Sequence, residues 1–432
     1  MPKVSIVWFR RDLRLGDHPA LATALADGDV LPLFVVDPAF DRAGAPRRAL
    51  LHDCLQALDE ATGGALVIRH GDPVDEIPAI AEEVGADTVY VSKDFAPYGR
   101  RRDDHVADAL RGAGRHLRGV GSPYAVEPGS VRKDDGKPYA VFTPFSRRWR
   151  THGWQTPIDA PRSPNWRTAP SDGLPLRPGI PFELPLATEA QVTADWQQFR
   201  STGLDHYAEL RDRPAVEGTS HLSPYLKYGL IHPRQLLINP QPSHEGAMVF
   251  QSELAWRDFY ADVLFHQPHT AWRNLDPKFD EIAVDTGPAA HEKFRVWCEG
   301  RTGFPIVDAG MRQLAATGWM HNRVRMIVAS FLVKDLHLPW QWGARFFLQH
   351  LLDGDLASNN HGWQWAAGTG TDAAPYFRVF NPTAQEKRWD PNGEYVQRWM
   401  PELGTSGYPA PIVDHAVERQ EALDRYQAIK RG

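Results

Sequence analysis

Residues 4–37 read VSIVWFRRDLRLGDHPALATALADGDVLPLFVVD: an apolar run, an amphipathic stretch and a second apolar run. The same alternation continues to about residue 125. Buried strands joined by helical crossovers build a parallel sheet with helices on both faces. The sequence therefore predicts a doubly wound α/β domain over residues 1–125. Ligands of such sheets bind outside the carboxyl ends of the strands, which here are the segments after Asp37 and Asp94.

The remainder of the chain divides into two further parts. Residues 126–190 are rich in Pro, Gly and Arg and have weak periodicity, which is typical of an interdomain connector. Beyond them strand signals fade and helical periodicity dominates, as in MVFQSELAWRDFYADVLFH at residues 248–266. We therefore expect an all-α domain over residues 191–432.

Charge and cysteine content exclude several classes of protein. The net charge is −6, so contact with nucleic acid phosphates requires a local basic patch. Arginine runs occur at residues 100–102 and 146–150, although such runs are more often solvated faces. The two cysteines have neither a disulfide framework nor metal-ligand spacing, and we expect no metal site. No segment resembles a signal peptide or a bilayer span, which favours a cytoplasmic protein without a membrane partner.

The stretch at residues 319–382 concentrates side chains that suit a binding site. It contains WMHNRVRM and DGDLASNNHGWQWAAGTGTDAAPYFRVFNP. The Arg325 guanidinium can hold the Asp353 carboxylate through two hydrogen bonds while Asp355 stays free to accept from a ligand N–H. The Asn359 amide can serve a ring nitrogen whose protonation changes. The alternative interpretation is a capped helix end with Asx turns.

Two other segments carry binding chemistry. In EGTSHLSPYLKYG (residues 217–229), hydroxyl groups stand at the start of a helical pattern, where free N–H groups favour an anion such as a pyrophosphate. An ordinary cap without a ligand is the alternative. In SELAWRDFY, Glu253, Trp256 and Arg257 share one helix face and could hold flipped bases by stacking and hydrogen bonds. A core tryptophan beside an intrahelical ion pair remains the other interpretation.

Four segments in this order, beginning with WFRRDLRLGDHPAL, resemble the DNA photolyase/cryptochrome family and most closely its class I cyclobutane pyrimidine dimer photolyases. The resemblance implies an α/β antenna-chromophore domain followed by a helical domain that binds FAD and DNA. It implies light-driven repair of cyclobutane pyrimidine dimers in damaged DNA by a monomer. A cryptochrome-type blue-light photoreceptor without repair activity is the alternative. The FAD-binding positions that it implies are Tyr207, Thr219, Ser220, His221, Leu222, Ser223, Arg325, Asp353, Gly354, Asp355 and Asn359.

The resemblance also implies which residues contact the lesion. Catalytic roles fall to Glu253, Trp256, Asn322 and Met326, with Asn359 tuning the flavin. Enzymes of the related (6-4) class carry His at the positions of Asn322 and Met326, so their absence favours cyclobutane dimers. The remaining positions implied to contact the DNA strand are Arg211, Arg257, Arg323, Arg378 and Gln385.

Two features depart from the family pattern. Trp363 and Trp340 match the proximal and middle members of the tryptophan relay that photoreduces flavin, but the distal position falls at Gly287, or at Val284 if the spacing shifts, and neither side chain can be oxidised. Trp272, Trp342 and Trp297 are candidate substitutes. Tyr98 and Gly99 stand where folate-binding members have Asn-Glu, which argues against folate as the antenna. The pattern instead resembles members that bind 8-hydroxy-5-deazaflavin, while FMN or no antenna remain open. The implied antenna contacts are Asp94, Gly99 and Lys227.

Overall fold

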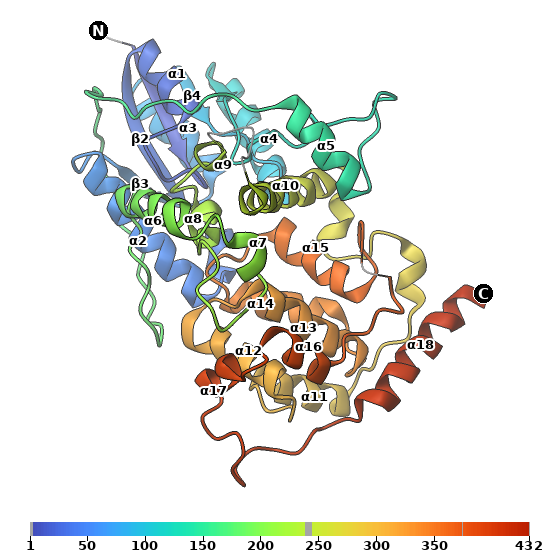
Figure 1. Cartoon of the computed structure of the whole chain (residues 1–432). Coiled ribbons are helices and arrows are strands. Elements are labelled where there is room, and N and C mark those ends of the chain that lie inside the picture. The colour runs from blue at the N-terminus through green and yellow to red at the C-terminus, as the bar shows by residue number, and fades with distance from the viewer. Residues whose placement is uncertain (1–2, 238–243, 374, 432) are drawn as a thin grey trace.

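The computed structural model describes residues 3–237, 244–373 and 375–431. Its N-terminal domain contains a five-stranded, fully parallel sheet with the order β3-β2-β1-β4-β5 (Figure 1). The chain winds from β1 outward to β3 and then returns to the other side of β1, which is the doubly wound topology expected from the sequence. The strands are β1 (Val4–Phe9), β2 (Asp29–Val36), β3 (Val67–His70), β4 (Thr88–Val91) and β5 (His116–Gly119).

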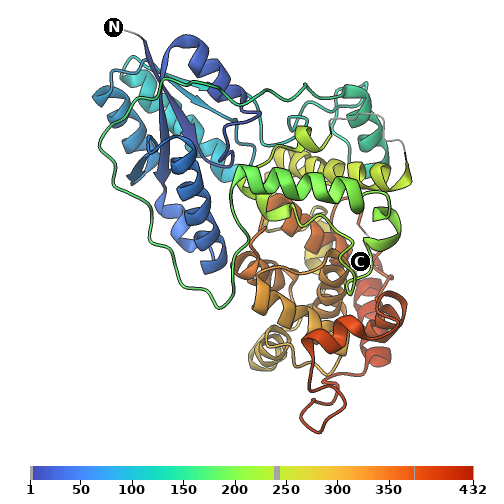
Figure 2. The same ribbon diagram turned by 60° about the vertical axis from the view of Figure 1, so that its left-hand side comes forward.

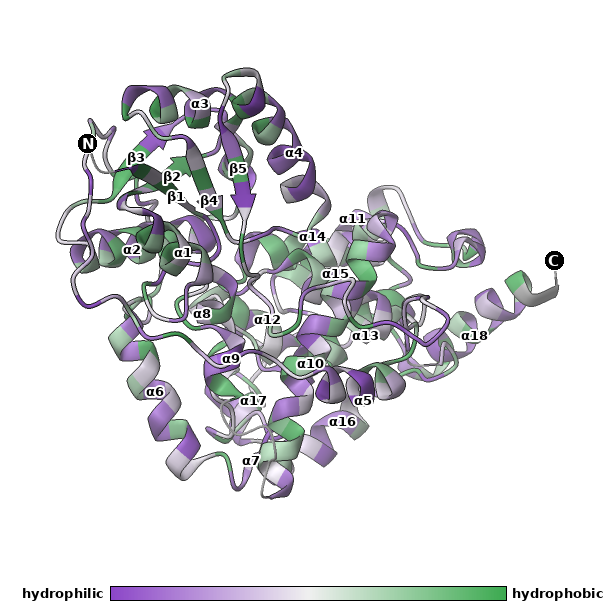
Figure 3. Cartoon of the chain, turned by 90° about the horizontal axis from the view of Figure 1, so that it is seen from above, coloured by the Kyte–Doolittle hydropathy of each residue, from purple (hydrophilic) through white to green (hydrophobic). Residues whose placement is uncertain are grey.

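Helices cover both faces of this sheet (Figure 3). On β1, Val7 and Phe9 belong to a core that includes residues of α1 and α2, whereas Ile6 and Trp8 belong to the core of α3 and α4. This alternation is the period of two that a strand imposes on its side chains. The predicted α/β class is confirmed. The helices of this domain are α1 (Pro19–Asp27), η1 (Pro38–Arg42), α2 (Ala45–Ala61), α3 (Pro73–Glu83) and α4 (Pro97–Gly112).

Residues 126–190, expected to form a connector, contain a helix that the sequence analysis did not predict. This helix, α5 (Phe142–His152), buries Phe145 and Trp149 and packs on the central helix of the second domain (Figure 1). The chain then passes over the sheet domain, where Trp166 pairs with Val30 as an isolated parallel bridge. The connector is therefore attached to both domains.

The second part is helical throughout its described residues (Figure 2). Its longest helix, α10, contacts α5, α7 and α15. None of the helices that the structure describes combines the length and apolar character needed to cross a bilayer. The helices are α6 (Glu189–Thr202), α7 (Tyr207–Leu210), α8 (Ser223–Tyr228), α9 (Pro233–Leu236), α10 (Glu245–His266), η2 (Pro268–Ala271), η3 (Pro277–Glu281), α11 (Pro288–Cys298), α12 (Pro305–Thr317), α13 (Asn322–Lys334), α14 (Trp340–His350), α15 (Leu356–Ala367), α16 (Pro382–Trp389), α17 (Glu394–Trp399) and α18 (His415–Arg431).

Close contacts fix the two domains to each other. The N–H of Leu13 donates to the Tyr228 carbonyl at 3.1 Å, and Arg234 forms a buried ion pair with Asp17 at 2.7 Å. Gly44 approaches α14 so closely that a Cβ atom there would lie 1.8 Å from the Gln349 carbonyl oxygen. The loop after β1 consequently lies beside α8 and the start of α15, where the main cavity begins.

Candidate functional site

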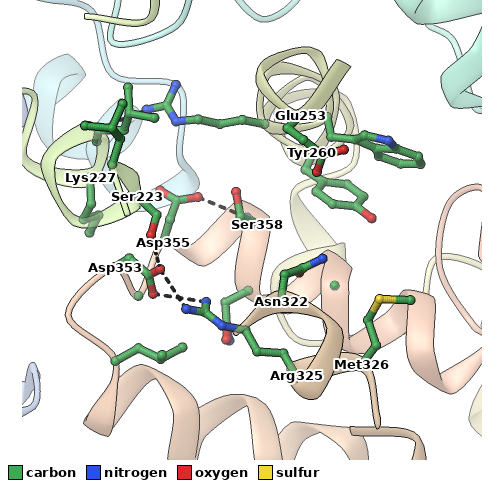
Figure 4. Close-up of a pocket in the computed structure, with 18 of the residues that line it drawn as sticks. Ser223, Lys227, Glu253, Tyr260, Asn322, Arg325, Met326, Asp353, Asp355 and Ser358 are labelled. Atoms are coloured by element: carbon green, nitrogen blue, oxygen red, sulfur yellow. Dashed lines mark hydrogen bonds and ion pairs between the residues drawn. The ribbon is translucent and has the colours of Figure 1, made fainter. Parts of the chain in front are cut away.

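A cavity of about 500 Å³ lies inside the helical domain, lined mainly by α7, α8, α10, α13, α14 and α15 (Figure 4). Its volume is within the range of small-molecule and cofactor sites. Positions far apart in the sequence meet there, since Glu253 of α10 and Asn322 of α13 line the same space. The predicted residues that line it are Tyr207, Arg211, Ser220, Leu222, Ser223, Lys227, Glu253, Trp256, Arg257, Asn322, Arg323, Arg325, Met326, Asp353, Gly354, Asp355, Asn359 and Trp363.

At one end of the cavity, Arg325 holds Asp353 as the sequence suggested. The guanidinium donates through Nη1 to Oδ1 at 3.1 Å and through Nη2 to Oδ2 at 2.9 Å. The Ser223 hydroxyl donates to the same Oδ2 at 2.6 Å (Figure 4). Two parallel N–H···O hydrogen bonds to one carboxylate fix the Arg325 and Asp353 side chains in a single geometry. α8, α13 and the loop before α15 are joined at this point.

Asp355 was expected to stay free for a ligand N–H, and that expectation is wrong. Its Oδ1 caps α15 by accepting from the Ser358 N–H at 3.0 Å, and its Oδ2 accepts from Arg11 at 2.5 Å. Burial disfavours the charged form, but Arg11 and then Lys227 outweigh it and hold the pKa of Asp355 well below its usual range. Arg11 comes from the loop after β1, so sequence spacing gave no sign of this partner.

The segment before α8 is only partly in the site. Ser220, Leu222 and Ser223 line the cavity, and no side chain caps the first turn of α8. Its leading N–H groups are therefore available to an anion. Thr219 and His221 lie outside the lining; His221 is exposed, pairs with Glu217 at 3.1 Å and contacts the Trp319 ring.

Asn359 presents an acceptor. Its Nδ2 group donates to the Ala344 carbonyl at 3.1 Å and to the Asn360 Oδ1 at 2.8 Å. No described residue donates to its side-chain oxygen, although Asn359 lines the cavity. This geometry suits a ligand ring that carries an N–H.

At the mouth, the cavity is lined by Glu253 and Trp256 of α10 and by Asn322 and Met326 of α13. Figure 4 shows Glu253 on the opposite side of the cavity from Asn322 and Met326. Glu253 accepts from Arg211 at 2.5 Å. Phe142 of α5 stacks on Trp256 with ring centroids 3.7 Å apart and an interplanar angle of 8°. Phe259 and Tyr260 also contact this indole, at centroid distances of 5.6 and 5.3 Å, and the Trp256 side chain lines the cavity.

Two predicted DNA contacts are engaged within the protein. Arg257 donates to the Pro123 carbonyl at 2.9 Å and the Leu226 carbonyl at 3.2 Å, and it lies over the Tyr124 ring. Arg257 therefore connects α10 to the N-terminal domain and to α8. Arg323 pairs with Asp212 at 2.8 Å.

Arg378 and Gln385 lie outside the lining of the cavity. Arg378 is exposed, with its guanidinium 5.8 Å from the Phe380 ring centroid. Gln385 accepts from the Trp389 indole N–H at 3.1 Å. Arg323 also lies over Trp389, so α13 and α16 meet at this indole.

The tryptophans are arranged unequally around the cavity. Trp363 lines it and contacts the Trp297 ring at a centroid distance of 6.1 Å. Trp340 donates its indole N–H to Asn274 at 3.0 Å and makes no ring contact with another aromatic in the described part of the chain. Phe294 joins Trp297 to the partly exposed Trp342, with centroid distances of 5.8 and 5.4 Å.

The residues expected to hold an antenna are divided between two places. Asp94 and Gly99 adjoin each other at the start of α4, where a Cβ atom on Gly99 would lie 2.1 Å from the Asp94 carboxylate. The Tyr98 hydroxyl donates to Asp37, which joins the two loops at the carboxyl end of the sheet. Lys227 instead lines the main cavity, where burial and Arg11 lower its pKa to about 7.

Sequence reasoning missed three further site residues. Tyr260 lines the cavity and follows Trp256 by four positions on α10, so helical spacing could have identified it. Trp365 also lines the cavity and lies in the run that marked the site. Phe142 had no detectable signal, because its contact with Trp256 spans more than a hundred positions.

Known proteins match both halves of the chain. Residues 5–164 match the family model of DNA photolyase, and residues 250–406 match the FAD binding domain of DNA photolyase. The deoxyribodipyrimidine photo-lyase of Thermus thermophilus is 42% identical over 433 residues, which cover 99% of each chain. A bacterial class III photolyase from Agrobacterium tumefaciens superposes with a TM-score of 0.90 at 35% identity, covering 100% of this chain and 98% of the other. A Synechocystis cryptochrome gives 0.88 at 27% identity, covering 98% and 99%.

Proposed function

Because this chain belongs to the DNA photolyase family, we propose that it catalyses light-driven repair of cyclobutane pyrimidine dimers in DNA, with FAD held in the main cavity. One observation carries the proposal: the polar side chains around the buried Asp353 and the aromatic and acidic side chains around Trp256 line one cavity. The lesion and the flavin could therefore be held beside each other, as electron transfer between them requires.

The residues at the buried end fit FAD. The uncapped first turn of α8 and the Ser220 and Ser223 side chains suit its pyrophosphate. The unused oxygen of Asn359 suits an N–H of the flavin ring. Bound FAD in its reduced form would supply, on excitation by blue light, the electron that splits the cyclobutane ring. The protein positions the two partners and excludes water.

The mouth suits a flipped pyrimidine dimer. The part of the Trp256 ring that lines the cavity can stack on a base, and Met326 can pack against the opposite side of that base. A carboxylate only accepts hydrogen bonds, so Glu253 would accept from a base imide N–H. The adjacent Arg211 supplies positive charge that can offset the charge of an electron transferred to the dimer.

The test uses protein whose flavin has been chemically reduced without oxygen and then illuminated with an oligonucleotide containing a thymine dimer. We expect recovery of intact thymines only in light, with loss of repair in Glu253→Ala and Trp256→Ala. Glu245→Ala, an exposed change on the same helix, is the matched control. Flavin photochemistry without repair in the unmodified protein would favour the photoreceptor alternative.

We further propose that photoreduction of oxidised flavin proceeds through Trp363 and then Trp297. The ring contact between these two indoles supports this order, whereas Trp340 has no such contact among the described residues. Electron paramagnetic resonance should detect a light-induced tryptophan radical that Trp297→Phe removes and Trp340→Phe retains. The opposite pattern would restore Trp340 as the second member.

For the second chromophore, we propose an 8-hydroxy-5-deazaflavin bound near Asp94 and Gly99, with FMN as the alternative. The joined loops at the carboxyl end of the sheet support this place. Reconstitution with each compound should give an added absorption band for the deazaflavin alone. Gly99→Val should remove that band while FAD remains, since a side chain there would displace Asp94.

A further inference from the structure

The segment before and within α5 is basic in a chain of net negative charge. Residues 127–152 contain six Lys or Arg and three Asp or Glu, whereas the whole chain has a net charge of −6. Arg147 and Arg148 are exposed on α5 and are not used by the site described above. Such a local concentration of positive charge can attract a polyanion that the whole molecule would repel.

α5 is held rigidly against the helix that carries Glu253 and Trp256. The buried Trp149 indole donates to Asp258 of α10 at 2.9 Å. Arg150 donates through Nε to Gln251 at 2.9 Å and through Nη2 to Ser252 at 2.8 Å. A charge on the outer face of α5 therefore has a fixed position relative to the mouth of the cavity.

The outer cations are weakly engaged within the protein. The Arg147 guanidinium has no hydrogen bond or ion pair with any residue that the structure describes, although the Arg147 carbonyl accepts from the Thr151 hydroxyl. Arg148 lies 3.5 Å from Asp134, whose side chain is 98% exposed, and Lys137 lies 3.6 Å from the exposed Asp135. Exposed pairs of this kind contribute little and exchange readily for another anion.

The position of α5 complements the cations on the other wall. α10 forms one side of the mouth and α13 the other (Figure 4). Arg323 lies on the α13 side, and Lys387 and Arg388 follow on α16. A nucleotide turned into the cavity stays bonded to a phosphate on each side of it. On the α10 side, the predicted DNA contact Arg257 is engaged within the protein, and α5 borders this side through Phe142.

We infer that the outer face of α5, with Arg147 and Arg148 at its centre, binds phosphates of the DNA that flanks the lesion. The inference rests on the proposed function, because it takes DNA to be the ligand that approaches the mouth of the cavity. Phosphate contacts fix register and orientation without reading sequence. The surface should therefore bind damaged and undamaged duplex alike.

The test measures duplex binding by fluorescence anisotropy across a range of salt concentrations, with and without a dimer in the duplex. In Arg147→Gln/Arg148→Gln we expect the slope of log K against log salt to become shallower by about 1.8, since each lost phosphate contact removes about 0.9. Arg101→Gln/Arg111→Gln on α4 makes the same charge change on an exposed helix of the other domain and should leave the slope unchanged.

A second ligand tests whether the α5 cations act by direct contact with flanking phosphates or through the overall charge of the protein. A free thymine-dimer dinucleotide has no flanking phosphates, so the α5 double variant should bind it as the unmodified protein does. An unchanged duplex slope, or an equal change in the α4 variant, would overturn the inference. If the slope responds as expected while the unmodified protein repairs no dimer, the α5 surface stands and the proposed function fails.

Discussion

The two ends of the cavity differ in how far their side chains are already paired with other protein groups. At the buried end, Arg325, Ser223 and Asp353 satisfy one another, and Arg11 is paired with Asp355. At the mouth, Phe142, Phe259 and Tyr260 contact the Trp256 ring, which still contributes to the lining of the cavity. The buried end is prebuilt to hold a permanent cofactor. The mouth keeps contact surface free for a transient ligand.

Removing the Asp353 side chain should have the largest effect, because Arg325 and Ser223 both donate hydrogen bonds to its carboxylate. In Asp353→Ala the Arg325 guanidinium would lose its bidentate partner in a mostly buried site. Loss of one partner of a buried pair costs about 3 kcal/mol or more. We expect lower stability in urea unfolding and failure to retain FAD on purification. A variant that kept both would show that the clamp is dispensable.

Truncating Trp256 should affect the mouth alone. Stacking of one base on an aromatic side chain contributes about 1–3 kcal/mol, so Trp256→Ala should weaken binding of dimer-containing DNA accordingly. Retained FAD would show that the buried end is intact. Equal weakening for undamaged DNA, measured by competition, would contradict a role in holding the lesion.

Phe142→Ala tests the covered face of the same indole and should have a smaller effect. The stacked pair contributes about 0.5–1.5 kcal/mol beyond area burial, which helps to fix the Trp256 ring. Affinity for the dimer should fall by less than in Trp256→Ala, as titration calorimetry can determine. A larger loss than in Trp256→Ala would mean that Phe142 itself contacts the ligand.

Lys227 is the exception at the prebuilt end, because its amine has no hydrogen bond or ion pair with any described residue. Burial and Arg11 lower its pKa from 10.5 to about 7. A lowered pKa in the folded state means that stability is lost as pH falls from 10.5 toward 7. In Lys227→Met, urea midpoints should vary less between pH 9.5 and 7 than in the unmodified protein, because this interval lies between the pKa values of Lys227 in the unfolded and folded states. An unchanged pH dependence would assign the effect to another group.

Local patterns predicted the sheet domain and helical domain well, since apolar runs with periods of two and 3.6 determine most of their elements. They missed β5, whose sequence HLRG lacks an apolar run because it forms an exposed edge. They missed α5, where Pro144 and three arginines obscure the buried pair Phe145 and Trp149.

In the site, spacing within one helix or one turn was informative. It grouped Glu253 with Trp256 and Asn322 with Met326. The pairing of Arg325 with Asp353 came instead from the match between a guanidinium and a carboxylate. Spacing within one helix or turn could not predict contacts between the domains. The partner of Asp355, for example, is Arg11, which lies 344 positions away. Such pairs depend on how the domains pack, which no local pattern contains.

The most direct test of the two-ended cavity is a crystal structure of the FAD-loaded protein bound to a duplex that contains a thymine dimer. We predict the flavin ring beside Asn359 and the dimer turned out of the duplex between Trp256 and Met326. A dimer that stays stacked in the duplex, with the mouth of the cavity facing solvent, would contradict the account.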